Sequence, residues 1–100
     1  MFENLPIEQV PFDLLNTHRF KDPRPEVEDL SPVIEEVSTF GITRPLDVVK
    51  CADGDFAVIN GHEIVGALEL IRANSWKFEN ILPSRMVPCR VSTDTTLLRK

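Results

Sequence analysis

The chain has 100 residues, of which 42% are hydrophobic and 27% are charged, and its formal net charge is −5 at pH 7. This length predicts one domain with one core, and the composition is that of a folded globular chain rather than a disordered or membrane-spanning one. The acidic balance excludes the broad basic surface with which many domains bind nucleic acid.

The charge is distributed unevenly along the chain. Residues 1–59 carry 12 acids against 5 bases, whereas residues 60–100 carry 4 acids against 6 bases, so a local anion site in the second part stays open. The N-terminal stretch "MFENLPIEQV" lacks the basic start and apolar run of a signal peptide, which predicts a cytoplasmic chain. Cys51 and Cys89 are predicted to be reduced thiols. No metal site is expected, because no Cys or His pair has ligand spacing.

The first half of the chain predicts a strand, a loop and a helix. Residues 7–10 predict a short strand with a turn after Pro11, and the polar, proline-rich residues 16–29 predict a loop. Apolar residues then recur at spacings of three and four, which predicts a helix over about 26–40 that ends at Gly41. Pro32 predicts that this helix is broken or restarts at Ser31.

The second half predicts a hairpin, a helix and a last strand. Residues 46–49 and 56–59 read as strands joined by the Asp53-Gly54 turn, and residues 62–73 return to helical spacing. Residues 74–85 predict a loop, and residues 86–91 predict a strand in which Pro88 indicates an edge position. The order β–α–β–β–α–β predicts an α+β fold, a small mixed β-sheet with packed helices. One domain is expected over residues 1–91, with a C-terminal tail at 92–100.

Several short motifs, taken in this order, resemble the ParB/sulfiredoxin superfamily, which includes ParB-like N-terminal and nuclease domains. The motifs are "NTHRF" at 16–20, "ITRPLDVV" at 42–49, "ADGDFAVINGHE" at 52–63 and "VPCRV" at 87–91. The resemblance covers about Ile7 to Val91 and implies a ParB/sulfiredoxin-like fold. Partition-type members carry a Gly-Glu-Arg-Arg-x-Arg-Ala box at the second helix, whose arginines hold a nucleoside triphosphate. Residues 61–67 keep its glycine and alanine but none of its arginines, and His62 stands where a sulfiredoxin needs cysteine, which excludes that activity.

The degenerate box still has features that can bind an anion. A glycine turn before a helix presents backbone N–H groups and the positive end of the helix dipole, so Asn60, Gly61 and His62 are candidate phosphate-binding residues. The resemblance implies that the loops carrying Arg19 and Arg44 approach this corner, where either arginine could supply positive charge. The alternative is that Asn60 caps the helix and both arginines are surface residues.

His62 and Glu63 are candidate catalytic residues. An imidazole exchanges protons near neutral pH, and a neighbouring carboxylate could act as a base or as a metal-phosphate ligand. The resemblance leaves enzymatic activity open; an active member would be a nucleotide hydrolase, a kinase or a nuclease.

The favoured function is that of a ParB-like domain that binds a nucleotide or phosphate group, with ATP or CTP and Mg²⁺ as candidate cofactors. The expected setting is plasmid- or phage-type DNA transactions (partition, regulation or nuclease-related), with DNA contacted only indirectly or weakly. The alternative is a stand-alone interaction module that kept the fold and lost nucleotide binding and catalysis. That module would have a protein partner or form a homodimer, through an exposed apolar patch around residues 76–82. A third hypothesis is DNA mimicry by the acidic helix.

Overall fold

The computed structural model describes residues 2–18, 29–74 and 78–98, without the side chains of Asn80 and Leu97. The described strands form one mixed sheet in the order β1-β5-β3-β4-β2. β5 is parallel to β3 and β2 is parallel to β4, whereas the β1–β5 and β3–β4 pairs are antiparallel. The expected α+β architecture is confirmed. The strands are β1 (Ile7–Pro11), β2 (Leu15–Asn16), β3 (Leu46–Lys50), β4 (Phe56–Asn60) and β5 (Met86–Ser92).

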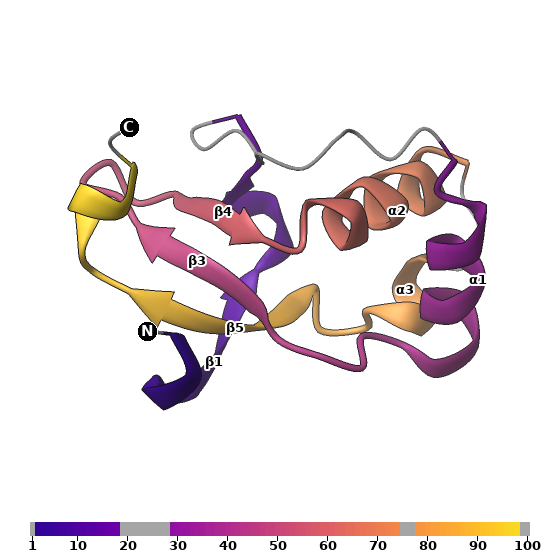
Figure 1. The fold of residues 1–100 in the computed structure, drawn as a ribbon. Coiled ribbons are helices and arrows are strands. Elements are labelled where there is room, and N and C mark those ends of the chain that lie inside the picture. The colour runs from indigo at the N-terminus through magenta and orange to yellow at the C-terminus, as the bar shows by residue number, and fades with distance from the viewer. Residues whose placement is uncertain (1, 19–28, 75–77, 99–100) are drawn as a thin grey trace.

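The helices gather at one end of the sheet, where β4 ends and β3 and β5 begin (Figure 1). α1 packs against α2, and the short α3 follows α2 before the chain enters β5. The helices are α1 (Ser31–Phe40), α2 (His62–Ala73) and α3 (Phe78–Ile81), with 3₁₀ turns η1 (Phe2–Asn4), η2 (Phe12–Leu14) and η3 (Thr95–Leu98). None of the helices in this described part has the length and apolar content needed to cross a lipid bilayer.

The core lies between α2 and the central strands. α2 buries Ile64, Val65, Leu68 and Ile71, which recur at helical spacing and form one face. This face meets the fully buried side chains of β3 and β5, among them Leu46, Val48, Val87 and Cys89. Burying one such aliphatic side chain stabilises the fold by about 1.5–3 kcal/mol. The position of the α2 N-terminus relative to β3 is therefore fixed by packing.

The start of α1 resolves the ambiguity at Pro32. The helix begins at Ser31, whose backbone N–H donates a 2.9 Å hydrogen bond to the Asp29 carboxylate, and Pro32 lies in the first turn. A proline is tolerated there because its missing N–H would have no partner within the helix. The Ser31 hydrogen bond also holds the pKa of Asp29 below its usual value. α1 therefore begins at Ser31, where the sequence predicted a break or restart, and residues 26–28 of the expected helix lie outside the described part.

Three sequence predictions about elements were wrong. β2 and α3 were expected to be loop, but each has too few residues to show a period. Pro88 was expected on an edge strand, yet β5 lies between β1 and β3. The β3–β5 ladder begins only at Cys89, so Pro88 itself is paired with β1 through Gln9 and has no β3 residue opposite it. Proline has no N–H to donate, so within a sheet it needs one side without a ladder partner. The β3 side of Pro88 meets this need, although β5 is not an edge strand.

The two cysteines are free and buried. Leu46 lies opposite Cys89 in the β3–β5 ladder, and Cys51 follows Leu46 by five residues. At the rise of a strand, this places Cys51 about 16 Å from Cys89. That separation is too large for a disulfide. Burial, and to a smaller extent the Asp47 carboxylate, raises the pKa of Cys89 to about 12. Cys89 is therefore a neutral core residue.

Candidate functional site at the N-terminus of α2

The corner between β4 and α2 is built around Gly61. Gly61 precedes the helix with φ +111°, and a Cβ added there would lie 2.6 Å from Cγ of Leu46, so only glycine fits. Its carbonyl accepts the N–H groups of Ile64 (3.0 Å) and Val65 (3.2 Å), which closes the first turn. The alternative in which Asn60 is the N-cap is wrong, because Asn60 ends β4 opposite Asp47 and Gly61 is at the N-cap position.

Arg44 lies at the same corner. Its Nη2 donates a 2.9 Å hydrogen bond to Oε1 of Glu63, the second residue of α2, in a salt bridge. The Glu63 side chain is only 14% exposed, whereas that of Arg44 is 67% exposed. The structure thus brings one predicted cation to the predicted anion corner, where a carboxylate of the chain already contacts it.

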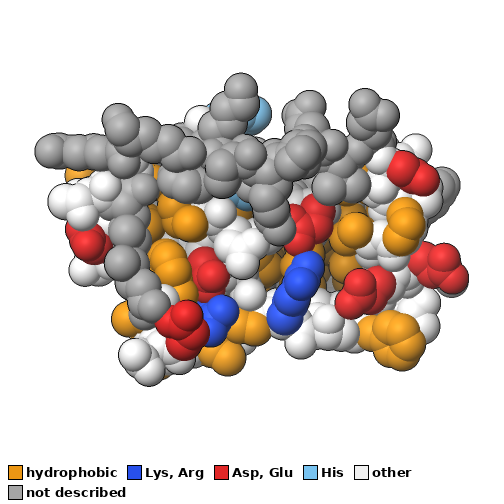
Figure 2. Space-filling model, in the orientation of Figure 1, with side chains coloured by type: hydrophobic (Ala, Val, Ile, Leu, Met, Phe, Trp, Pro, Cys, Tyr) orange, Lys and Arg blue, Asp and Glu red, His pale blue; other side chains and the backbone are white. Residues whose placement is uncertain are grey.

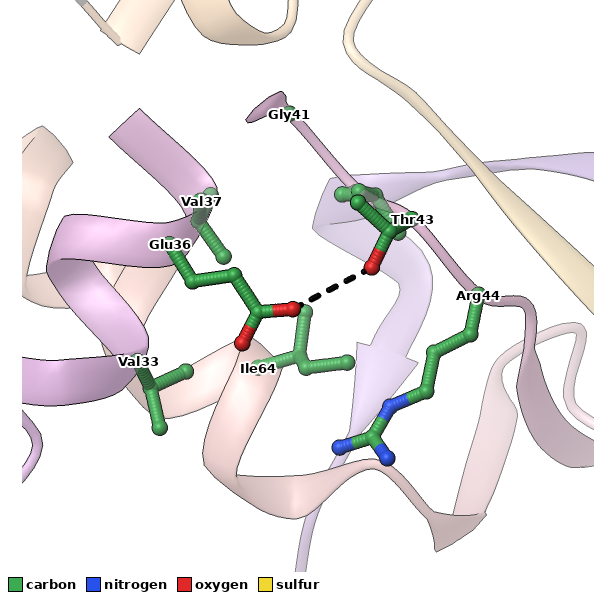
Figure 3. A pocket seen from close by; sticks show the side chains of 8 residues that line it. Val33, Glu36, Val37, Gly41, Thr43, Arg44 and Ile64 are labelled. Carbon is green, nitrogen blue, oxygen red and sulfur yellow. Dashed lines mark hydrogen bonds between the residues drawn. The ribbon is translucent and has the colours of Figure 1, made fainter. Parts of the chain in front are cut away.

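A small pocket opens beside this ion pair, between α1, the loop at 41–44 and α2. Its cavity volume of about 30 Å³ is enough for roughly two water molecules. The Thr43 hydroxyl donates a 3.3 Å hydrogen bond to the Glu36 carboxylate across the pocket, with Ile64 behind them (Figure 3). A nucleoside does not fit into this space. The lining residues are Val33, Glu36, Val37, Gly41, Ile42, Thr43, Arg44 and Ile64.

The other predicted site residues occupy different positions. His62 is the first residue of α2 and is half-buried, with its Nδ1 atom inside the protein. Arg19 lies outside the described residues. Glu36 and Thr43 were not predicted, because residues seven apart in sequence meet here only through the path of the chain after α1. The assignment of these side chains to a ligand stays a prediction.

Acidic and basic side chains lie side by side around the corner. On the face shown in Figure 2, lysine and arginine side chains lie next to acidic ones and do not gather into a basic patch. Asp47 is buried and accepts a 3.0 Å hydrogen bond from Nε of Arg90, which joins β3 to β5 near the corner. Ionic contacts that are largely shielded from water hold their geometry because breaking them leaves an uncompensated charge. The Arg90 side chain is therefore held in place by Asp47 and links β5 to β3.

A second cluster of possible ligands lies at the β3–β4 turn. Ligand atoms of Cys51, Asp53 and Asp55 all lie within 4.8 Å of one another. The turn itself explains this proximity, because Cys51 N–H donates to Asp55 O at 2.9 Å and Gly54 N–H donates to Cys51 O at 3.1 Å. The Asp55 carboxylate also accepts a 2.9 Å hydrogen bond from Asn16 of β2. These residues therefore stabilise the β3–β4 hairpin and its contact with β2.

The expected apolar patch at residues 76–82 is wrong in its described part. Phe78 and Leu82 are 6% and 5% exposed and belong to the core, and residues 76–77 lie outside the described ranges. The Phe78 ring contacts Phe12 and the guanidinium of Arg72, whose position no sequence signal indicated. Large exposed apolar side chains occur elsewhere, notably Phe40 at 73% and Ile7 at 58%.

Comparison with known proteins identifies the fold. No protein-family model matches the sequence, and no curated protein is significantly similar to it. The fold is ParB-like. It is similar to the crystal structure of the C-terminally truncated chromosome-partitioning protein ParB from Caulobacter crescentus complexed with CTP-gamma-S, with a TM-score of 0.65 and 19% identity. The match covers 93% of this chain and 48% of that one, so this chain spans about half the length of its structural neighbour.

Proposed function

We propose that this chain is a ParB-like domain that binds a nucleotide or phosphate group at the N-terminus of α2. The carrying observation is the position of Arg44, whose largely exposed guanidinium lies at the first turn of this helix beside Glu63. A helix N-terminus favours an anion through its N–H groups and its dipole, and a guanidinium adds a charged fork. That the structural neighbour is complexed with CTP-gamma-S supports this class of ligand.

The geometry favours binding through the phosphate end of a ligand. The pocket of about 30 Å³ is too small for a base or a sugar, so these parts would lie on the surface. Asn60 and Gly61 shape the turn, and the N–H groups of the first turn would face the phosphate. His62 would exchange a proton with a ligand through Nε2, because its Nδ1 is buried. Contacts this few predict weak binding, with dissociation constants of about 0.1–1 mM.

The proposed setting is a DNA transaction of the plasmid or phage type. The net charge of −5 opposes direct contact with the DNA backbone. The domain would therefore act on a nucleotide signal or on a protein bound to DNA. A fluorescence-anisotropy titration with duplex DNA should show little binding at 150 mM salt, and tight binding would contradict this part of the proposal.

Isothermal titration calorimetry with CTP, ATP and GTP, with and without Mg²⁺, tests the proposal. We expect Arg44→Ala to weaken binding at least fivefold, because the charge-assisted hydrogen bonds are lost. The matched control is Lys50→Ala, which removes one positive charge from an exposed position at the other end of β3. Absence of heat with all three nucleotides, and with inorganic phosphate and CMP, contradicts the proposal. Equal affinity of the Arg44→Ala and Lys50→Ala variants removes Arg44 from the site.

A second candidate is the interaction module, which is favoured by the exposed Phe40 at the end of α1. An aromatic ring left 73% exposed gains free energy when a partner covers it. The partner would be a protein or a second copy of the chain. Sedimentation equilibrium from 10 μM to 1 mM should show self-association that Phe40→Ser abolishes. A monomer throughout this range, with wild type and variant alike, contradicts the homodimer.

A further inference from the structure

We infer that Glu63 determines which anions the N-terminus of α2 accepts, by occupying the anion position with its own carboxylate. This inference rests on the proposed function, because it concerns the same corner. Glu63 is in the first turn of α2, where the helix dipole favours negative charge, and it accepts a 2.9 Å hydrogen bond from Arg44. The Glu63 carboxylate thus interacts with both the helix dipole and Arg44, which are the two interactions proposed for a bound phosphate.

The burial of Glu63 makes its charge effective. Its side chain is 14% exposed, so solvent and salt screen it less than an exposed carboxylate. A phosphate that approaches Arg44 must displace this carboxylate and then remains within a few ångströms of it. The neighbouring carboxylate of Glu36 lies across the same pocket from Arg44, and its negative charge adds to the repulsion.

Repulsion of this kind grows with the charge of the ligand. A triphosphate carries about twice the charge of a monophosphate, so the same carboxylate penalises the triphosphate more. The site therefore selects phosphate monoesters over triphosphates. Removing the charge of Glu63 without changing its shape should release Arg44 and reduce this preference.

Titrations of inorganic phosphate, CMP and CTP in EDTA and in Mg²⁺ test this inference on wild type, Glu63→Gln and Glu69→Gln. Glu69 is the matched control, because it is an exposed residue of the same helix, six residues further along. We expect Glu63→Gln to tighten CTP binding about tenfold and CMP binding about threefold, since one like charge is removed. Glu69→Gln should change either affinity by less than about twofold, because exposed charges are screened.

The outcomes separate this inference from the proposed function. If wild type binds these ligands and Glu63→Gln behaves like Glu69→Gln, Glu63 is not selective and the proposed function still stands. If Glu63→Gln instead abolishes binding that requires Mg²⁺, Glu63 is a ligand for the metal-nucleotide complex, which overturns the inference. If no variant binds any of the probes, both are wrong. Glu63→Ala and circular dichroism spectra establish that a change reflects the charge and not the fold.

Discussion

Gly61→Ala tests the packing of the corner on which the proposed site depends. Gly61 has φ +111°, and a Cβ there would lie 2.6 Å from Cγ and 3.3 Å from Cδ2 of Leu46. Leu46 is 1% exposed and belongs to the core, so its side chain has no open space into which to move. The substitution therefore combines a backbone that L-residues avoid with an overlap between two buried groups.

The expected destabilisation follows from these two terms. A non-glycine residue in the left-handed region costs about 1–2 kcal/mol, and overpacking a close-packed core costs about 1–3 kcal/mol. The alanine also restricts the unfolded chain, which offsets about 0.4–1 kcal/mol. The free energy of unfolding should thus fall by about 2–4 kcal/mol, which is a large part of the about 5–15 kcal/mol of a typical domain.

Urea unfolding followed by circular dichroism measures this loss, and Gly54→Ala is the matched control. Gly54 has φ +96°, but a Cβ there would meet nothing within 4 Å, so only the backbone term applies and about 0.5–1.5 kcal/mol is expected. Adding Leu46→Ala should reduce the cost of Gly61→Ala by about 1–2 kcal/mol, because the obstacle is removed. If Gly61→Ala and Gly54→Ala agree within about 0.5 kcal/mol, the steric reasoning is refuted.

Three further changes probe the sheet and the helix end. Burial raises the pKa of the Cys89 thiol to about 12 in the folded protein, whereas in the unfolded chain it is near about 8.5. Below about pH 8.5 the thiol is neutral in both states, and the free energy of unfolding falls as the pH rises above that value because only the unfolded chain ionises. Unfolding free energy should fall by about 2–3 kcal/mol between pH 8 and 10.5, beyond the fall seen in Cys89→Ala. Asp47→Asn should destabilise by about 1–3 kcal/mol in urea titrations, because Arg90 loses its charged acceptor. Arg72→Gln should lower stability by about 0.5–1 kcal/mol in thermal melts, since the guanidinium lies 5.1 Å from the centroid of the Phe12 ring.

The elements that could be predicted from the sequence are those defined by local rules. The helix at 62–73 and the hairpin at Asp53-Gly54 follow from periodicity and turn chemistry within a few residues, and both are present. The start of α1 was left as two alternatives because a proline in the first turn and a kink have the same sequence. The structure decides between them, because α1 begins at Ser31, whose N–H donates a hydrogen bond to the Asp29 carboxylate.

The rest depends on where distant segments meet. The edge assignment of Pro88 failed because strand order is set by the whole sheet, not by one missing N–H. The meeting of Arg44 with the corner was expected from the family resemblance alone, since residues 19 apart have no local reason to pair. The neutralisation of Arg44 by Glu63 was not expected, because an ion pair requires side-chain positions that sequence spacing does not specify.

The corner separates the residues that maintain the fold from those proposed to select a ligand. Gly61 and Leu46 fix the path from β4 into α2 by contacts inside the core, and those contacts need no ligand. Arg44 and Glu63 lie at the other end of the same turn, where the Arg44 side chain is 67% exposed and that of Glu63 is 14% exposed. Under the proposed function, ligand preference should follow the charge at position 63, because the Glu63 carboxylate is the acceptor that contacts Arg44. We therefore expect Glu63→Gln to alter ligand affinity and Gly61→Ala to alter the free energy of unfolding.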